Sequence, residues 1–330
     1  MLWSSGMGKA SLFLIAKFIV SVGLLWVIAG RVDGRAAWAA VGGVPASSVL
    51  LALLALALQG GVLGWRWHRV MALIGGRLPF PAALRLTFVG LFFNQALPSS
   101  IGGDGLRIWG ACRLGVDPGL AAASVVIERA SGLFALSLLA ALSLPAVWDG
   151  LGGSPLGAAL LAAPPVAALG LGLLAVADRW AAGWLPRGVA RTVSAIAEGL
   201  RAIARRPRAL VEIVALGALA SMAGIAGAYA LGRGLGLDLG PAAYFALVGG
   251  AILISALPLS IAGWGLREVA VVALFAAVGV AADTALPISV LFGVAMIVVA
   301  LPGGALWLAG RGRAPSGTGN RRAWAERRAP

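Results

Sequence analysis

Charged residues are scarce in this chain, and their scarcity excludes a soluble globular protein. Only 12% of the 330 residues are Asp, Glu, Lys or Arg, whereas a soluble domain usually carries about a quarter. Hydrophobic types make up 60% of the chain, and the mean hydropathy is +0.96. Because such a chain cannot cover a water-facing surface with charge, the sequence indicates an integral membrane protein.

Cysteine and histidine are nearly absent, with Cys112 and His68 the one example of each. A single cysteine excludes an internal disulfide, and this pair is too few for a zinc site built from histidine and cysteine. The sequence also has no Walker A loop and no GxSxG, HExxH or CxxC motif. We therefore expect no catalytic constellation, no metal and no cofactor, and the chain is predicted not to be an enzyme.

Positive charge is in excess, with 26 Lys and Arg against 12 Asp and Glu and a net charge of +14. The arginines fall between apolar segments and in the C-terminal tail, not along one amphipathic face. This distribution follows the positive-inside rule of membrane proteins and suits anionic headgroups. We therefore expect the lipid bilayer, and no nucleic acid, as the partner of this charge.

Apolar segments of about 20 residues, long enough to cross about 30 Å of hydrocarbon, predict six full transmembrane helices. Their ranges are 11–30, 46–65, 120–146, 155–177, 209–231 and 286–309. The basic segments 66–85 and 178–208 are predicted to be cytoplasmic, as are both termini, in the inner (plasma) membrane. Residues 1–310 form the predicted transmembrane domain, and residues 311–330 form a basic, disordered cytoplasmic tail.

A basic, tryptophan-rich stretch follows the second predicted helix and comprises Trp65, Arg66, Trp67, His68 and Arg69. Tryptophan and arginine together favour the boundary between hydrocarbon and water. We therefore expect this stretch at the membrane interface.

Two segments of the chain repeat each other. Residues 96–107 read ALPSSIGGDGLR, residues 256–267 read ALPLSIAGWGLR, and nine of these twelve positions are identical without a gap. The shared proline, serine, glycines and arginine are not low-complexity filler, so we interpret the pair as an internal repeat.

Each copy of the repeat is predicted to break a helix inside the membrane, because proline and glycine disfavour continuous helix. Irregular backbone at that depth is tolerated only inside protein or beside a wet cavity. We expect two re-entrant hairpins entering from opposite sides, an inverted repeat typical of transporters. The predicted fold is therefore an all-α polytopic membrane protein. The predicted hinge residues are Pro98, Gly102, Gly103, Gly105, Pro258, Gly263 and Gly265.

Charged side chains stand beside both predicted breaks. Charge at membrane depth is costly and marks a functional site by default. Arg107 and Arg267 occupy matching positions of the repeat, and the planar fork of a guanidinium suits phosphate. Arginines from two opposed hairpins would pass one phosphate between them. The residues predicted to bind a lipid headgroup are Asn94, Asp104, Arg107, Glu128, Arg129, Arg267 and Glu268.

Other roles for these residues stay open at this point. Arg107 with Glu128, and Arg267 with Glu268, would alternatively form ion pairs that only join helices. The acidic residues would hold the arginines in place, or take up protons if transport is proton-coupled. Asn94 is equally suited to cap the broken turn.

Four motifs in order resemble a known family: FFNQALP at 92–98, GGDGLR at 102–107, SVVIERASG at 124–132 and PLSIAGWGLRE at 258–268. Over about residues 10–310 the chain resembles the flippase-like transmembrane domain of lysylphosphatidylglycerol synthetases. In the two-part synthetases this domain is thought to flip the aminoacylated lipid, while a soluble domain transfers the amino acid. The residues that match the family's motif are Asn94, Pro98, Gly103, Asp104, Arg107, Glu128, Arg129, Gly263, Gly265, Arg267 and Glu268.

The resemblance implies lipid translocation without lysyl transfer, since only about 20 polar residues follow the last predicted span. The predicted function is a flippase for an anionic phospholipid or a polyprenyl-phosphate lipid, which crosses through a polar groove between the hairpins. One alternative is a membrane-embedded enzyme that modifies lipid through Asp104 or Glu128. Another is an accessory subunit that presents a lipid to a transferase. The expected protein partners are a second copy, through glycine-rich faces, or a lipid-pathway enzyme.

Overall fold

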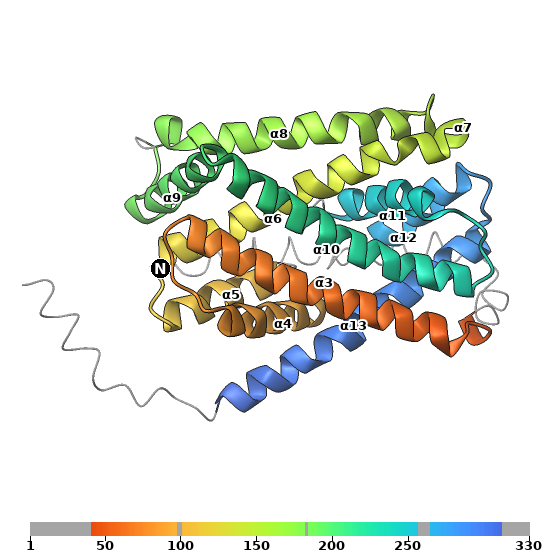
Figure 1. The fold of residues 1–330 in the computed structure, drawn as a ribbon, viewed down its shortest axis with the longest axis horizontal. Coiled ribbons are helices and arrows are strands. Elements are labelled where there is room, and N and C mark those ends of the chain that lie inside the picture. The colour runs from red at the N-terminus through yellow and green to blue at the C-terminus, as the bar shows by residue number, and fades with distance from the viewer. Residues whose placement is uncertain (1–40, 98–100, 182–183, 257–264, 312–330) are drawn as a thin grey trace, which may run out of the picture.

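A computed structural model describes residues 41–97, 101–181, 184–256 and 265–311 of the chain. Every regular element in these ranges is helical, which confirms the all-α class (Figure 1). The first predicted span, 11–30, and the predicted tail after residue 311 lie outside the described residues. The predicted hinges Pro98, Pro258 and Gly263 lie outside them as well.

Five described helices are long and apolar enough to cross a membrane. They are α3 (Ala46–Leu73), α6 (Pro118–Leu142), α8 (Pro155–Ala181), α10 (Pro207–Gly234) and α13 (Ala282–Arg311). Each has 25 to 30 residues, which is about 37–45 Å of helix. These helices confirm the predicted spans after the first one and define a polytopic membrane protein.

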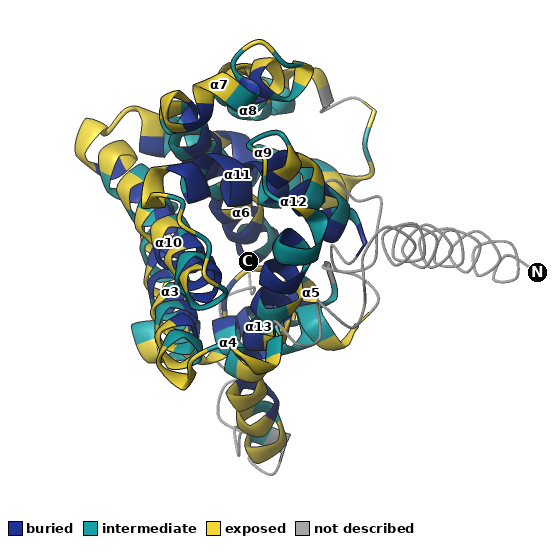
Figure 2. Ribbon diagram, turned by 90° about the vertical axis from the view of Figure 1, so that its right-hand side faces the viewer, coloured by how far each residue is buried: buried dark blue, intermediate teal, exposed yellow. Residues whose placement is uncertain are grey.

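Exposed apolar side chains on the outer faces of these helices agree with a lipid environment. Leu50, Leu54 and Leu58 on α3, and Leu169 and Leu173 on α8, are all exposed. Figure 2 shows exposed residues on the outside of α3, α8 and α10 and buried residues gathered inside the bundle. A water-soluble protein rarely shows such continuous apolar surface.

Each interrupted region predicted from the sequence contains two short helices. The first has α4 (Phe80–Ala96) and α5 (Ile101–Arg113), and the second has α11 (Pro241–Ser255) and α12 (Leu266–Ala276). At 11 to 17 residues they measure about 17–26 Å, shorter than the hydrocarbon core. The two helices of each pair contact each other. The first pair lies toward the end of the bundle near α9, and the second toward the opposite end (Figure 1).

Local sequence sets the ends of the short helices. Leu97, which precedes Pro98, has an extended backbone, as expected for a residue before proline. At the start of α12, Gly265 adopts φ +84°, a conformation that glycine tolerates best. The Glu268 carboxylate accepts a hydrogen bond of 2.7 Å from the Gly265 N–H. This cap fixes the first turn of α12, which carries Arg267.

Two predicted connections are not simple loops. The stretch Trp65–Arg69 belongs to α3, which continues to Leu73, and Arg66 and Trp67 are buried. Their predicted position at the membrane interface stays a prediction. The segment 178–208 contains an amphipathic helix, α9 (Arg187–Ala204), which packs on α6 and α8 through its apolar face. At the end of the bundle away from α9, a short 3-10 turn (Leu144–Val147) and α7 (Trp148–Leu151) connect α6 to α8.

Helix α13 contacts both pairs of short helices, since it packs against α4 and against α12. Its crossing with α4 is close, because a Cβ at Gly303 would lie 1.9 Å from the backbone oxygen of Phe88. Nearby, the rings of Phe93 and Trp307 lie 5.1 Å apart. Glycine at 303 therefore sets the distance between α13 and α4.

Replacing Gly303 by Ala should force α13 away from α4 and destabilise the bundle by about 1–3 kcal/mol, the usual cost of overpacking. The measurement is the midpoint of thermal unfolding in detergent. Gly172→Ala on α8 is the matched control, because a Cβ there meets no atom within 4 Å. Equal midpoints for the two variants would contradict the close crossing.

Candidate functional site

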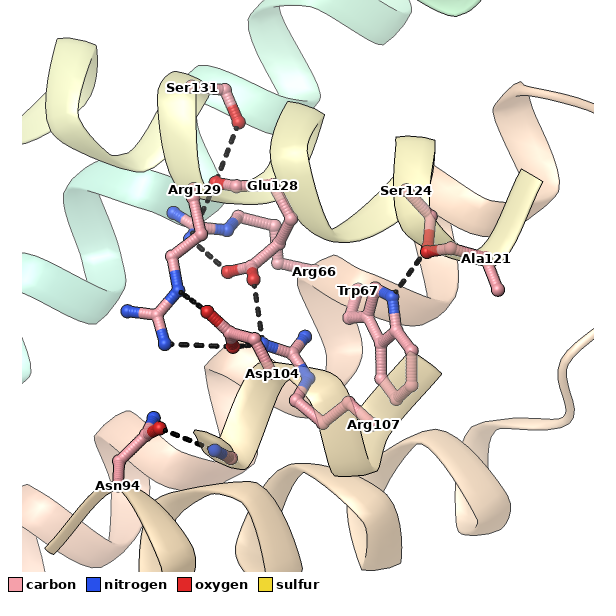
Figure 3. Close-up of polar contacts among 11 residues, drawn as sticks. Arg66, Trp67, Asn94, Asp104, Arg107, Ala121, Ser124, Glu128, Arg129 and Ser131 are labelled. Carbon is pink, nitrogen blue, oxygen red and sulfur yellow. Dashed lines mark hydrogen bonds and ion pairs between the residues drawn. The ribbon is translucent and has the colours of Figure 1, made fainter. Parts of the chain in front are cut away.

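Five charged side chains from three helices meet inside the bundle and are called the charge cluster below. Arg66 comes from α3, Asp104 and Arg107 from α5, and Glu128 and Arg129 from α6 (Figure 3). Four of the five were predicted as site residues, and the structure brings these four together. Three guanidinium groups and two carboxylates give the cluster a formal charge of +1.

Glu128 is the centre of the charge cluster and is only 2% exposed. Its Oε1 accepts from Arg66 Nη2, and its Oε2 accepts from Arg107 Nη1 at 3.0 Å. Arg66 Nη2 also donates to the backbone oxygen of Glu128, at 3.1 Å. One carboxylate thus joins the cations of α3 and α5 to α6, as expected for buried charges that must be paired.

Arg66 is the member of the charge cluster that the sequence did not predict as a site residue. Its guanidinium lies where two neighbouring helices carry glycine: a Cβ at Gly132 would be 2.7 Å from Nη2, and one at Gly217 would be 2.9 Å from Nη1. Glycines on α6 and α10 therefore make room for the Arg66 side chain. Gly132 follows Glu128 by four residues, about one helical turn, so the glycine and the carboxylate lie on the same face of α6.

Asp104 and Arg129 form the least buried edge of the charge cluster. Arg129 holds its carboxylate through two hydrogen bonds, Nε to Oδ2 at 3.0 Å and Nη2 to Oδ1 at 2.9 Å. Arg107 Nη1 lies 3.4 Å from Asp104 Oδ1. The Arg129 side chain is 48% exposed, whereas that of Asp104 is 16% exposed, so this ion pair is partly accessible.

Arg107 is 5% exposed, and an aromatic ring holds it in place. Its Cζ lies 4.3 Å from the centre of the Trp67 ring, a cation–π geometry. Trp67 is itself fixed by a hydrogen bond of 2.9 Å from its Nε1 to Ser124 Oγ. Among the described residues, Nε and Nη2 of Arg107 have no hydrogen-bond partner.

Asn94 takes the capping role that the sequence left open. Its Oδ1 accepts a hydrogen bond of 3.1 Å from the Gly103 N–H and so ties the first turn of α5 to the end of α4. The approach is close, because a Cβ at Gly103 would lie 2.1 Å from the backbone oxygen of Gly90. The predicted hinge at Gly103 is thus a point where two helix backbones touch.

Arg267, Glu268 and Ser289 form a second, formally neutral cluster at the start of α12. Glu268 Oε1 accepts from Arg267 Nη2 at 2.8 Å and from Ser289 Oγ at 3.0 Å. A small cavity lies beside it, lined by Arg267, Ser289 and apolar residues that include Val248 and Phe292. This cluster joins α12 to α13, whereas Arg107 joins α5 to α6, so the two predicted arginines belong to separate clusters.

Within the described ranges, no three His, Cys, Asp or Glu side chains are grouped as metal ligands usually are. The carboxylates of both clusters instead accept hydrogen bonds from arginine. Both clusters are thus built from arginine–carboxylate ion pairs, some within one helix and some between helices.

Fold and site define a class: a multi-pass, all-helical membrane protein with arginine–carboxylate clusters buried in its bundle. The chain belongs to the family described as the lysylphosphatidylglycerol synthase TM region, whose profile matches residues 14–304. A search of curated proteins with this chain finds no match. Membership confirms the resemblance seen in the sequence motifs.

Removing the carboxylate of Glu128 should destabilise the protein strongly, because Glu128→Gln leaves Arg66 and Arg107 buried without their main partner. Breaking a buried pair in this way costs about 3–5 kcal/mol. The double variant Arg66→Met/Glu128→Gln should lose less free energy of unfolding than the two single variants lose together, because each single variant already removes the Arg66–Glu128 interaction. Unfolding in detergent micelles measures all three variants.

Arg233→Met is the control for these variants, since Arg233 forms an exposed ion pair with Asp238 worth about 0–1 kcal/mol. Strictly additive losses in the double variant would contradict the pairing of Arg66 with Glu128.

Proposed function

We propose that this protein moves a phosphate-bearing lipid from one leaflet of the membrane to the other and does no covalent chemistry on it. The observation that carries the proposal is the charge cluster, in which Arg66, Arg107 and Glu128 are buried and which has a formal charge of +1. Burying charge among apolar helices is costly and is rarely found without a function. A surplus of one cation favours an anionic headgroup.

The physical problem of translocation is the phosphate, because moving a bare charged group through hydrocarbon is prohibitively costly. Arginine donors replace the hydration shell of a phosphate. In the proposed mechanism the headgroup passes between the charge cluster and the second cluster at Arg267, while the acyl or prenyl tails stay in lipid. The proposed substrates are an anionic phospholipid and a polyprenyl-phosphate lipid.

The same mechanism includes two re-entrant hairpins, α4–α5 and α11–α12, that enter the inner membrane from opposite sides. Three features support this part of the proposal: helices shorter than the bilayer, contact between the helices of each pair, and basic connections predicted on the cytoplasmic side. Broken helices that meet near the middle of the membrane provide polar backbone for a substrate.

Cysteine labelling tests the hairpins. In a Cys112→Ala background, single cysteines at Arg77 and Leu114, which flank α4–α5, should react with an impermeant maleimide from the cytoplasmic side. Cysteines at Asp238 and Ala281, which flank α11–α12, should react from the opposite side. All four positions are exposed. If Arg77 and Leu114 react from opposite sides, α4–α5 crosses the membrane once and the hairpin is wrong.

Leaflet exchange in liposomes tests the function itself. Purified protein should speed the exchange of a fluorescent anionic phospholipid or a labelled polyprenyl phosphate. Arg107→Ala should slow that exchange by roughly tenfold or more, the effect of losing hydrogen bonds from a charged group. The control is Arg233→Ala, at the exposed ion pair with Asp238, which should leave exchange unchanged.

Three results would contradict the proposed function. One is exchange that Arg107→Ala does not slow. Another is folded protein that exchanges no lipid. The third is chemical conversion of the lipid that depends on Asp104 or Glu128, which would indicate the membrane-embedded enzyme instead.

A further inference from the structure

One edge of the Arg107 guanidinium is buried and has no hydrogen-bond partner among the described residues. That edge consists of Nε and Nη2, whose N–H bonds point the same way and match two oxygens of one anion. Nη1 is already engaged by Asp104 and Glu128, and the Trp67 ring packs against the guanidinium. A buried donor left unpaired is costly, so this edge favours binding of an anion.

The protein uses the same edge elsewhere to bind carboxylates. Arg69 donates from Nε and Nη2 to the two oxygens of Glu212, at 2.5 and 2.9 Å. Arg129 donates from the same two atoms to Asp104, at 3.0 and 2.9 Å. Of these three arginines, Arg107 differs in having its forked edge turned away from any carboxylate of the described chain.

Neighbouring side chains position this edge. Arg66 and Arg107 share the single carboxylate of Glu128. The one negative charge of Glu128 is therefore divided between two cations and does not fully neutralise Arg107. The aliphatic part of Arg107 packs where Gly90 has no side chain. Thr87 stands one turn before Gly90 on α4, and its buried hydroxyl is likewise without a partner among the described residues. Thr87 therefore lies on the same face of α4 as Gly90, the face against which Arg107 packs.

We infer that the Nε/Nη2 edge of Arg107 binds the phosphodiester of a lipid with one net negative charge, and that the cluster selects such a lipid over a zwitterionic one. The inference rests on the proposed function and names the class of lipid. One phosphodiester brings one negative charge, which matches the cluster's surplus of one. The ammonium of a zwitterionic headgroup would instead meet carboxylates already paired with arginines.

Binding, measured without transport, tests the inference. The full chain in detergent micelles is loaded with fluorescent phosphatidylglycerol, and unlabelled phosphatidylglycerol or phosphatidylcholine with the same acyl chains is added as competitor. Both lipids carry one phosphodiester, but only phosphatidylcholine carries an ammonium. Phosphatidylglycerol should compete better by roughly tenfold. Soluble glycerol phosphate is a third competitor, and displacement by it at equal concentration would overturn the lipid assignment in favour of a free-anion site.

Charge variants at the exposed ion pair separate charge count from structural damage. Arg129→Gln lowers the formal charge of the cluster to zero and should abolish the preference for phosphatidylglycerol. Asp104→Asn raises the charge to +2 and should keep or increase the preference. The double variant Asp104→Asn/Arg129→Gln lacks the ion pair but returns to +1, so the preference should return. A double variant without preference, as structural damage would give, overturns the charge-count argument.

Arg107→Lys tests the forked edge, because lysine keeps the charge but cannot donate two parallel hydrogen bonds. Phosphatidylglycerol binding should fall by roughly tenfold, and unchanged binding would overturn the role of the edge. The result is independent of leaflet exchange. If phosphatidylglycerol binds preferentially but is not exchanged between leaflets, the binding site at Arg107 is supported and translocation is contradicted. If lipids are exchanged without any preference for phosphatidylglycerol, the binding site at Arg107 is contradicted and translocation is not.

Discussion

The buried ion pair between Arg66 and Glu128 is the interaction on which the rest of the site depends. A charge removed from water between apolar helices needs a partner, because an unpaired one costs several kcal/mol. This pair fastens α3 to α6, and glycines on α6 and α10 allow the guanidinium to fit. Since Glu128 also binds Arg107, the pair fixes where the third helix, α5, presents its cation.

The two copies of the internal repeat have become chemically different. Asp104 in the first copy corresponds to Trp264 in the second, and Ile108 in the first corresponds to Glu268 in the second. The first copy is capped by Asn94 on the preceding helix, whereas the second is capped by Glu268 of its own helix. As a result, one arginine belongs to a cluster of charge +1 and the other to a neutral cluster. Among the described residues, the surplus positive charge thus belongs to the cluster of the first copy.

The sequence alone predicted much of the fold. Apolar length placed four of the five described spans to within four residues at each end, whereas α3 continues eight residues past its predicted end, because crossing hydrocarbon imposes only a minimum helix length. Proline and glycine placed both interruptions, because backbone preferences act locally. Charge at membrane depth is costly, and on this ground four charged residues were predicted to bind a headgroup: Asp104, Arg107, Glu128 and Arg129. In the structure these four lie in one cluster.

Tertiary structure alone decided which charges meet and what remains unpaired. Arg66 and Glu128 are 62 positions apart, and Arg69 and Glu212 are 143 apart, so no local pattern links them. Only the structure shows that α3 continues past Arg66 and Trp67 and that glycines of α6 and α10 make room for Arg66. The sequence determined which residues lie in the membrane, because transfer from water depends on each segment by itself. Packing between helices decided their partners, because pairing depends on side chains from distant segments.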